Sequence, residues 1–319
     1  MLPSMQYPGQ QGPTLDTTIH NPVGTFNGVR SGHWEIKEDE FECNEAQKIG
    51  EGAMAVICKA KLRGMPCVAK KLKTGTQINS QAYKDLVMEL DILCSVGKHP
   101  NLVEFYGACI SNPEKPILFE EFVDGPNVEA FFQRNQGFKL KRKTIYSWSL
   151  DIIQALDFLH NRNPIIIHRD LKPANLILNR GMDRVKLADF GMSKKVDQQA
   201  NGNIQHKGHT GTRRYMAPEV VGVAVSNYTE KADIYSAGLI IWYIACGQRP
   251  PIDSRPNVGS VEWAQLSQLV GKMIEQDAKA RPSAQECINT LANMPERPDI
   301  SDPTDVAPKV GGACQCVVQ

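Results

Sequence analysis

The chain has no excess of charge of either sign. Its 319 residues include 36 Lys and Arg against 35 Asp and Glu, which gives a formal net charge of +1 at pH 7. A surface that binds nucleic acid needs a clustered positive field. The balance of charges therefore argues against nucleic acid as a partner.

Long apolar runs are also absent. No stretch approaches the roughly 20 residues that a transmembrane helix requires, and no apolar signal region opens the chain. We therefore expect no membrane-spanning helix, no secretion and a cytoplasmic location. The nine cysteines are odd in number and scattered, which is typical of reduced thiols in the cytosol. Residues 1–33 have little apolar periodicity and many Pro, Gly and Gln residues, so we predict that they are disordered.

Two short motifs carry the strongest chemical signal. The run from His168 to Asn175 reads HRDLKPAN, and the triplet from Asp189 to Gly191 reads DFG. A single Asp or Asn is more often a residue of a turn or a helix cap. That explanation does not account for all the residues of the two motifs together. The two motifs match, in the right order, the catalytic-loop and metal-binding signatures of protein kinases. On these residues the chain resembles the protein kinase family.

The resemblance implies a role for each polar residue of the motifs. Asp170 is the expected catalytic base, which accepts the proton of the substrate hydroxyl, and Lys172 is expected to contact the transferring phosphoryl group. Asn175 and Asp189 offer the oxygen atoms expected to bind Mg²⁺. A lysine at the position of Lys172 indicates serine/threonine rather than tyrosine specificity in this family.

A glycine-rich segment resembles the loop with which kinases cover the phosphates of ATP. It comprises Ile49, Gly50, Glu51, Gly52, Ala53, Met54, Ala55, Val56 and Ile57. The first two glycines let the backbone approach phosphate closely. Ala55 replaces the third glycine of the family pattern and Ile57 replaces its valine. We expect Ala55 to tune nucleotide affinity rather than to abolish binding.

The strand expected at residues 67–73 supplies the lysine that should contact the phosphates. Lys70 and Lys71 are adjacent, and side chains alternate along a strand, so the two point to opposite faces. We prefer Lys70, with Lys71 as the alternative. The resemblance gives Glu89 as the partner of this lysine. Leucines at three- and four-residue spacing predict a helix around Glu89, over 83–93.

Residues 117–125 resemble the hinge that holds adenine through backbone groups. Glu121 and Val123 are the residues expected to make these contacts. This alignment makes Glu120 the residue that guards the inner pocket, where the family usually has an apolar residue or threonine. A shift of one residue would put Phe119 there instead.

Other residues match structural landmarks of the family. Glu219 should form a buried ion pair with Arg281, and Asp233 should begin a helix that braces the catalytic loop. Apolar residues at helical spacing over 145–160 predict a buried helix face before that loop. They are Ile145, Trp148, Ile152, Leu156 and Leu159.

The resemblance covers about residues 34–295 and predicts an α+β, two-lobed protein kinase fold. A small lobe of antiparallel strands with one helix should span 34–123, and a mainly helical large lobe should span 124–295, with ATP and Mg²⁺ between them. The length suits one such unit. The chain resembles the tyrosine-kinase-like group, whose members are mostly serine/threonine kinases, in three segments: Trp34-Glu35-Ile36, 210–219 and 233–236.

The segment after the DFG triplet offers few hydroxyl groups for regulation. Between Ser193 and Thr210 there is no Ser, Thr or Tyr. We expect Thr212 to contact the catalytic loop and to shape the substrate site. Thr210 is the better candidate for phosphorylation, and a phosphate there could pair with Arg169. We expect Thr210→Ala to lower activity.

The last residues, 296–319, form a Pro- and Gly-containing tail that ends in a second motif. Cys316-Val317-Val318-Gln319 fits the C-a-a-X pattern, and Gln at its end favours a farnesyl group on Cys316. A single lipid anchors weakly, and palmitoylation of Cys314 could add the second signal. The alternatives are an ordinary tail and, less favoured, a metal site, since two thiolates fall short of four ligands.

Together these features predict an active serine/threonine kinase that acts on a protein substrate and is a peripheral membrane protein through its lipidated tail. One alternative is a pseudokinase that binds without catalysis, which only Ala55 and Glu120 favour. Another is a small-molecule kinase, which the segment ending Ala217-Pro218-Glu219 argues against because that segment serves protein substrates.

Overall fold

The computed structural model describes most of the chain between residues 25 and 299. The described residues are 25–26, 29–30, 33–51, 55–77, 80–196, 212–221, 229–252, 254–295 and 297–299. Several predicted site residues lie outside this part: Gly52, Ala53, Met54, Thr210, Cys314 and Cys316. Within the range 1–33, which we predicted to be disordered, β1 (Thr25–Phe26) and β2 (Val29–Arg30) form a short antiparallel pair.

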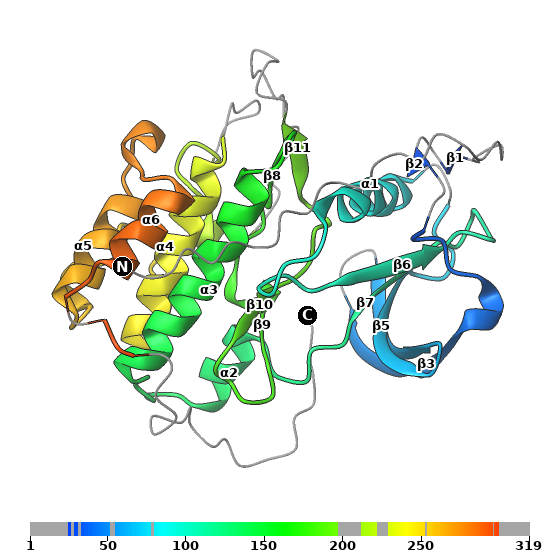
Figure 1. Cartoon of the computed structure of the whole chain (residues 1–319), viewed down its shortest axis with the longest axis horizontal. Coiled ribbons are helices and arrows are strands. Elements are labelled where there is room, and N and C mark those ends of the chain that lie inside the picture. The colour runs from blue at the N-terminus through cyan, green and yellow to red at the C-terminus, as the bar shows by residue number, and fades with distance from the viewer. Residues whose placement is uncertain are drawn as a thin grey trace.

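The first lobe is built on a five-stranded sheet in which all neighbours are antiparallel, in the order β3-β4-β5-β7-β6 (Figure 1). Its strands are β3 (Phe41–Glu51), β4 (Ala55–Leu62), β5 (Met65–Leu72), β6 (Phe105–Cys109) and β7 (Ile117–Glu121). A 3-10 turn, η1 (Glu38–Glu40), leads into β3. The small side chains of Cys67 and Ala69 are buried against Phe119, with Leu62, in an apolar cluster on one side of this sheet.

Helix α1 (Gln81–Val96) lies beside this sheet (Figure 1). Ser80 begins it, because its side chain accepts a hydrogen bond from the backbone N–H of Tyr83. Leu86, Leu90 and Leu93 are buried along one face, as their spacing predicts. The buried face also carries Glu89, whose charge needs a partner.

The segment from Trp34 to Ile36 pairs with the edge strand β6. The backbone N–H of Ile36 donates to Ala108 O at 2.9 Å, and Ala108 N–H donates to Trp34 O at 2.8 Å. Between them Gly107 adopts a φ of +148°, and a Cβ atom there would lie 2.2 Å from Trp34 O. Only glycine permits so close an approach of the two backbones.

The second lobe is mainly helical (Figure 1). Its helices are α2 (Val128–Arg134), α3 (Arg142–His160), α4 (Lys231–Cys246), α5 (Ala264–Met273) and α6 (Ala284–Ala292). Short strands β8 (Ile165–Ile167), β9 (Leu176–Leu178), β10 (Val185–Leu187) and β11 (Lys194–Val196) pair antiparallel as β9 with β10 and β8 with β11. Short 3-10 turns complete the lobe: η2 (Pro173–Asn175), η3 (Arg213–Tyr215), η4 (Val258–Ser260) and η5 (Ala278–Ala280).

Helices α3 and α4 form the centre of the large lobe. The apolar residues that predict the α3 face are all buried, and Trp148 is fully enclosed. Helix α4 is buried on all sides from Ala232 to Ile244, as expected of a helix that other helices surround. Gly247 ends it in the left-handed conformation, with φ +69°. The structure thus confirms the predicted α+β, two-lobed class.

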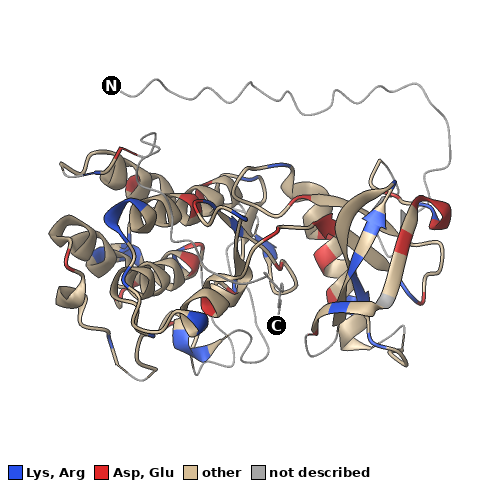
Figure 2. Ribbon diagram, turned by 90° about the horizontal axis from the view of Figure 1, so that it is seen from below, with Lys and Arg blue, Asp and Glu red and all other residues tan. Residues whose placement is uncertain are grey.

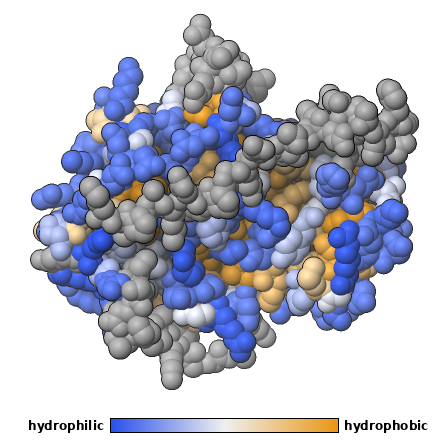
Figure 3. All heavy atoms as spheres, in the orientation of Figure 1, coloured by the Kyte–Doolittle hydropathy of each residue, from blue (hydrophilic) through white to orange (hydrophobic). Residues whose placement is uncertain are grey.

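The surface has no dominant sign of charge. Basic and acidic residues are interspersed over both lobes (Figure 2). On the face in Figure 3, hydrophilic residues cover much of the periphery and hydrophobic ones show mainly in recessed places. Among the described residues, no helix is both long and apolar enough to cross a membrane.

Candidate active site

Three charged side chains from three separate segments meet between the lobes. Lys70 Nζ on β5 lies 2.6 Å from Glu89 Oε1 on α1 and 2.9 Å from Asp189 Oδ1 in the DFG triplet. Glu89 is 2% exposed, whereas the Asp189 side chain is 39% exposed. The lysine therefore bridges a buried carboxylate and a carboxylate that can still reach a ligand.

The three groups shift one another's protonation. Burial alone would lower the pKa of Lys70, but the carboxylates of Asp189 and Glu89 outweigh it and raise that pKa. Lys70 holds the pKa of Asp189 well below its usual range. Burial raises the pKa of Glu89, and Lys70 opposes this effect. Lys70 stays a cation and Asp189 an anion at neutral pH, as binding of phosphate and metal requires.

The register of the sheet distinguishes the two adjacent lysines. Lys70 lies opposite Ile57 on β4 and Leu118 on β7, whereas Lys71 lies opposite Val56 and Ile117. Directly opposite residues of neighbouring strands share a face of the sheet. The ion pair that we expected with Glu89 is made by Lys70, and Lys71 points to the other face.

The same register distinguishes Glu120 from Phe119, the two candidates for the residue that guards the inner pocket. Glu120 lies opposite Val68, two residues before Lys70, and so shares the face of Lys70. Phe119 points the other way and is fully buried in the cluster with Ala69. The geometry therefore favours Glu120 over Phe119 at this position. Burial, with the nearby charge of Glu89, raises the pKa of Glu120 to about 7.

The catalytic loop holds its polar groups in a compact arrangement. Lys172 Nζ lies 2.7 Å from Asp170 Oδ2. The amide nitrogen of Asn175 donates to Asp170 O at 2.8 Å and to Asp170 Oδ2 at 3.3 Å. Asp170 Oδ1 is buried and has no hydrogen-bond partner in the described part of the structure. A buried carboxylate oxygen without a donor is suited to accept one from a bound substrate.

The donor set fits Mg²⁺. Because the amide nitrogen of Asn175 is used by Asp170, its amide oxygen remains for a metal. Asp189 adds a half-exposed carboxylate. Mg²⁺ is typically held by one or two carboxylates together with phosphate oxygens, rather than by a protein cage. No group of three or more His, Cys, Asp or Glu residues that could hold a metal occurs among the described residues.

Asp233, near the start of α4, holds the catalytic loop by its backbone. Its Oδ2 accepts from His168 N–H at 2.8 Å and its Oδ1 from Arg169 N–H at 2.9 Å. His160 Nε2 lies 3.0 Å from the same carboxylate. Arg169 and Asp189 have positive φ angles, +70° and +66°, which are unfavourable for residues other than glycine. The contacts of Asp233 and Lys70 stabilise these two strained turns.

Comparison with known proteins agrees with this geometry. The family model "Protein kinase domain" matches residues 43–291. The chain belongs to the protein kinase family. The matched residues fall within the predicted range 34–295, whose bounds, like the boundary between residues 123 and 124, stay predictions.

Several curated kinases are similar to this chain. Serine/threonine-protein kinase VIK of Arabidopsis thaliana is 30% identical over 82% of this chain and 62% of its own length. Mitogen-activated protein kinase kinase kinase 7 of Homo sapiens is 29% identical over 82% of this chain and 43% of its own length. Probable serine/threonine-protein kinase drkB of Dictyostelium discoideum is 28% identical over 84% and 40%. The chain thus spans less than two thirds of the length of these relatives.

The glycine-rich segment expected to cover the phosphates is described in part. Gly50 and Glu51 end β3, opposite Ile57 and Val56 of β4, and Ile49 precedes them. Ala55 begins β4, opposite Leu72. The tip between the two strands, residues 52–54, lies outside the described residues.

The hinge residues have contacts that hold them to both lobes. Both carboxylate oxygens of Glu121 accept from Lys186 Nζ, at 2.8 and 2.6 Å. Val123 is buried with Val103 and Ala188 in a small apolar cluster. Their predicted contacts with adenine stay predictions.

The end of the activation segment is tied to the large lobe. Arg281 donates to both carboxylate oxygens of Glu219, at 2.6 and 2.7 Å, and its side chain is fully buried. The predicted ion pair therefore forms. Thr212 is exposed, and among the described residues its hydroxyl makes no hydrogen bond to the catalytic loop. Thr210 lies outside the described residues.

Two ion pairs of the site were missed from the sequence. Lys186 bridges β10 to the hinge at Glu121, and Lys195 on β11 lies 2.7 Å from Asp91 on α1. These pairs join residues 65 and 104 positions apart. No local motif marks them, so only the fold could reveal that β11 contacts the helix that carries Glu89.

Proposed function

We propose that this chain is an ATP-dependent protein serine/threonine kinase. The observation that carries the proposal is that Lys70, Glu89 and Asp189 meet between the lobes while Asp170 keeps a buried oxygen free of partners in the described part. In protein kinases the pairing of lysine with glutamate and the placement of the DFG aspartate must both be in place for transfer. The same arrangement argues against a pseudokinase.

Each residue has a task in the proposed reaction. Lys70 binds and orients the phosphates of ATP, and Glu89 holds Lys70 in position. Asp170 Oδ1 accepts the proton of the substrate hydroxyl as the hydroxyl oxygen bonds to the γ-phosphorus of ATP, while the bond from that phosphorus to the β–γ bridging oxygen breaks and ADP leaves. Lys172 donates to the phosphoryl oxygens, which gain charge during transfer. Bound Mg²⁺, held by Asn175 and Asp189, would neutralise charge on the phosphate oxygens.

The serine/threonine specificity rests on two lines of support. Lys172 stands two residues after Asp170, where it indicates this specificity. Among the similar kinases, VIK is named a serine/threonine-protein kinase and drkB a probable one.

The experiment measures transfer of labelled phosphate from ATP to casein and to myelin basic protein, with Mg²⁺ and with Mn²⁺. We expect label on serine and threonine, and a loss of roughly 10²–10⁴-fold in Asp170→Asn, the range of general-base contributions. ATP affinity should be unchanged in this variant. Equal transfer by both proteins, or label on tyrosine alone, would contradict the proposal.

We also propose that the enzyme works at a cytoplasmic membrane surface. The support is the C-a-a-X pattern at Cys316, with Cys314 nearby for a second lipid. Cells would be labelled with a farnesyl analogue and fractionated, with wild type, Cys316→Ser and Cys314→Ser compared. We expect label and membrane association to disappear in Cys316→Ser, and label alone to persist in Cys314→Ser. Equal labelling of wild type and Cys316→Ser would end this proposal.

A further inference from the structure

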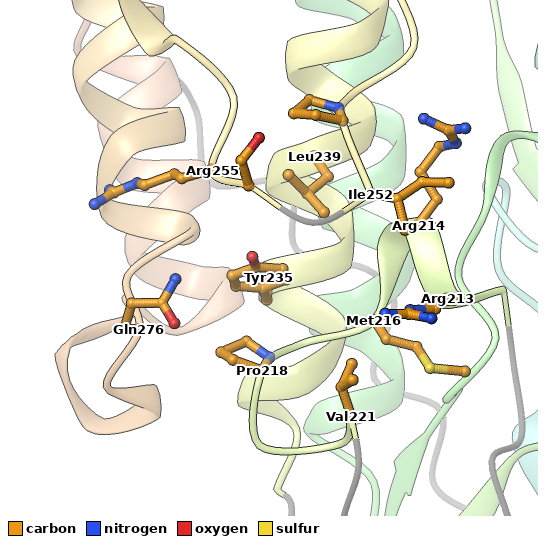
Figure 4. A pocket seen from close by; sticks show the side chains of 12 residues that line it. Arg213, Arg214, Met216, Pro218, Val221, Tyr235, Leu239, Ile252, Arg255 and Gln276 are labelled. Atoms are coloured by element: carbon orange, nitrogen blue, oxygen red, sulfur yellow. The ribbon is translucent and has the colours of Figure 1, made fainter.

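A concave site lies in the large lobe, and none of the residues that line it belongs to the charged cluster around Lys70. It is a pocket of about 410 Å³ between the end of the activation segment, helix α4 and the loop before η4 (Figure 4). Its floor includes Tyr235 and Leu239 of α4. The volume is sufficient for one or two side chains of a bound segment.

Exposed apolar residues gather at this pocket. Five large hydrophobic residues are exposed in the described part of the chain, and two of them, Val221 and Ile252, line the pocket. Ile252 is 48% exposed. Met216 and Pro218 extend the apolar wall. An exposed apolar wall of this kind, when it borders a cavity, marks a place where another apolar side chain can be buried.

Arginines stand on two sides of the pocket. Figure 4 shows Arg255 on one side and Arg213 with Arg214 on the opposite side, with Leu239 and Tyr235 between them. None of the described residues that line the pocket is acidic. A segment with acidic side chains on both sides of an apolar residue matches this pattern of charge.

Two of these guanidinium groups are fixed in place. Arg255 Nη2 donates to Gly271 O at 2.7 Å and lies 3.1 Å from Glu275 Oε1, while Arg214 Nη1 donates to Pro250 O. A guanidinium has five N–H donors, so these contacts leave others for a carboxylate. A guanidinium that is already fixed loses less freedom when it binds.

The pocket and the catalytic loop are held by the same helix. Asp233 of α4 accepts from the backbone of the catalytic loop, and one turn later Ser236 Oγ donates to Tyr215 O at 2.7 Å. Tyr235 and Leu239 of the same helix line the pocket. A segment bound in the pocket is therefore placed in a fixed relation to Asp170.

We propose that this pocket binds the protein substrate through a segment in which a large apolar residue is flanked by acidic residues. This inference rests on the proposed kinase function and specifies the substrates that the site accepts. It assigns Arg213, Arg214 and Arg255 to substrate selection and Ile252 with Val221 to the apolar contact.

The first test is a peptide library with one fixed serine or threonine and every other position varied. Wild type, Arg213→Glu and the control Lys61→Glu would be compared, since Lys61 lies on β4 in the other lobe and its change alters net charge equally. We expect wild type and Lys61→Glu to prefer Asp or Glu over Lys by roughly tenfold at one or more positions. Arg213→Glu should lose or reverse this preference. The same preference in all three proteins, or none in wild type, would overturn the proposal.

The second test does not depend on catalysis. A fluorescent peptide with Leu between acidic residues would be titrated into wild type and Ile252→Asp, and its anisotropy measured. We expect the mutant to bind roughly tenfold more weakly, because it places a carboxylate at the apolar wall. A scrambled basic peptide should bind neither protein. Equal binding of the acidic peptide to both proteins would refute the pocket. If wild type bound the acidic peptide more tightly than Ile252→Asp but transferred no phosphate to casein or myelin basic protein, the kinase function would be refuted and the pocket would remain supported.

Discussion

Asp170 is bound through one carboxylate oxygen to Lys172, at 2.7 Å, while its other oxygen is buried without a hydrogen-bond partner among the described residues. The two oxygens thus have different surroundings. One is held by the lysine that we propose contacts the transferring phosphoryl group, and the other is the oxygen that we propose accepts the proton of the substrate hydroxyl. The contact orients the carboxylate before any substrate arrives.

Removal of this lysine should slow transfer without weakening nucleotide binding. In Lys172→Ala we expect kcat to fall on the order of 100-fold, the typical effect of losing one donor to developing charge. The affinity for ATP should change little, because in the proposed reaction Lys70 makes the ground-state phosphate contact. Steady-state kinetics and ATP titration would check this. A variant with unchanged kcat would show that Lys172 has no part in transfer.

The two adjacent lysines of β5 provide a matched pair of variants. Lys70→Ala strands the buried carboxylate of Glu89 and removes the phosphate contact, so we expect ATP affinity and kcat/KM to fall, the latter by about 100-fold or more. Lys71→Ala changes the same charge on the opposite face and should stay within about threefold of wild type. ATP titration by calorimetry and the transfer assay would measure both effects. Equal losses in both variants would contradict the assignment.

Glu120 should make stability depend on pH. Its pKa is raised to about 7 by burial and by Glu89, so the folded state holds a proton that the unfolded state releases near pH 4.5. Stability therefore falls as pH rises from about 4.5 to 7, and the cost is complete above pH 7. We compare the free energy of unfolding of Glu120→Gln with that of wild type at pH 5 and at pH 8. The difference in favour of the variant should be larger at pH 8 than at pH 5 by about 1–3 kcal/mol.

The measurement is urea unfolding at both pH values, without nucleotide or metal. Glu42→Gln is the control, since it makes the same chemical change at a highly exposed side chain. A difference between Glu120→Gln and wild type that stays constant with pH would show that Glu120 ionises normally.

The ion pair between Glu219 and Arg281 should stabilise the large lobe. Arg281 is fully enclosed, so Glu219→Ala leaves a buried charge unpaired, and we expect a loss of about 3–5 kcal/mol in free energy of unfolding. Glu262→Ala removes an exposed pair with Lys139 and should cost less than about 1 kcal/mol. Urea unfolding would compare the two, and similar losses would mean that burial of Arg281 does not decide the effect.

Much of the site could be predicted because its residues lie in short motifs. Asp170, Lys172 and Asn175 are neighbours in sequence, and the pairing of Lys70 with Glu89 follows from one strand and one helix. The register of the sheet was needed to choose between Lys70 and Lys71, and between Glu120 and Phe119. It places Lys70 and Glu120 on one face of the sheet and Lys71 and Phe119 on the other. Sequence periodicity does not fix that register.

Contacts between distant segments that match no motif of the family could not be predicted. The pair of Lys195 with Asp91 depends on how β11 crosses α1. The pocket at Ile252 is formed by four separate segments, none of which has a motif for binding. The contact expected between Thr212 and the catalytic loop is likewise not found among the described residues, where Thr212 is exposed.

The close fit of Trp34 against Gly107 limits how far the chain can be shortened from its N-terminal side. The segment 34–36 covers part of β6, the edge strand of the sheet, and an uncovered edge invites pairing with other chains. Shortened versions that begin after Ile36 would expose that edge and should aggregate on expression. A version that begins before Trp34 keeps the edge covered and is the better starting point for assays and crystals.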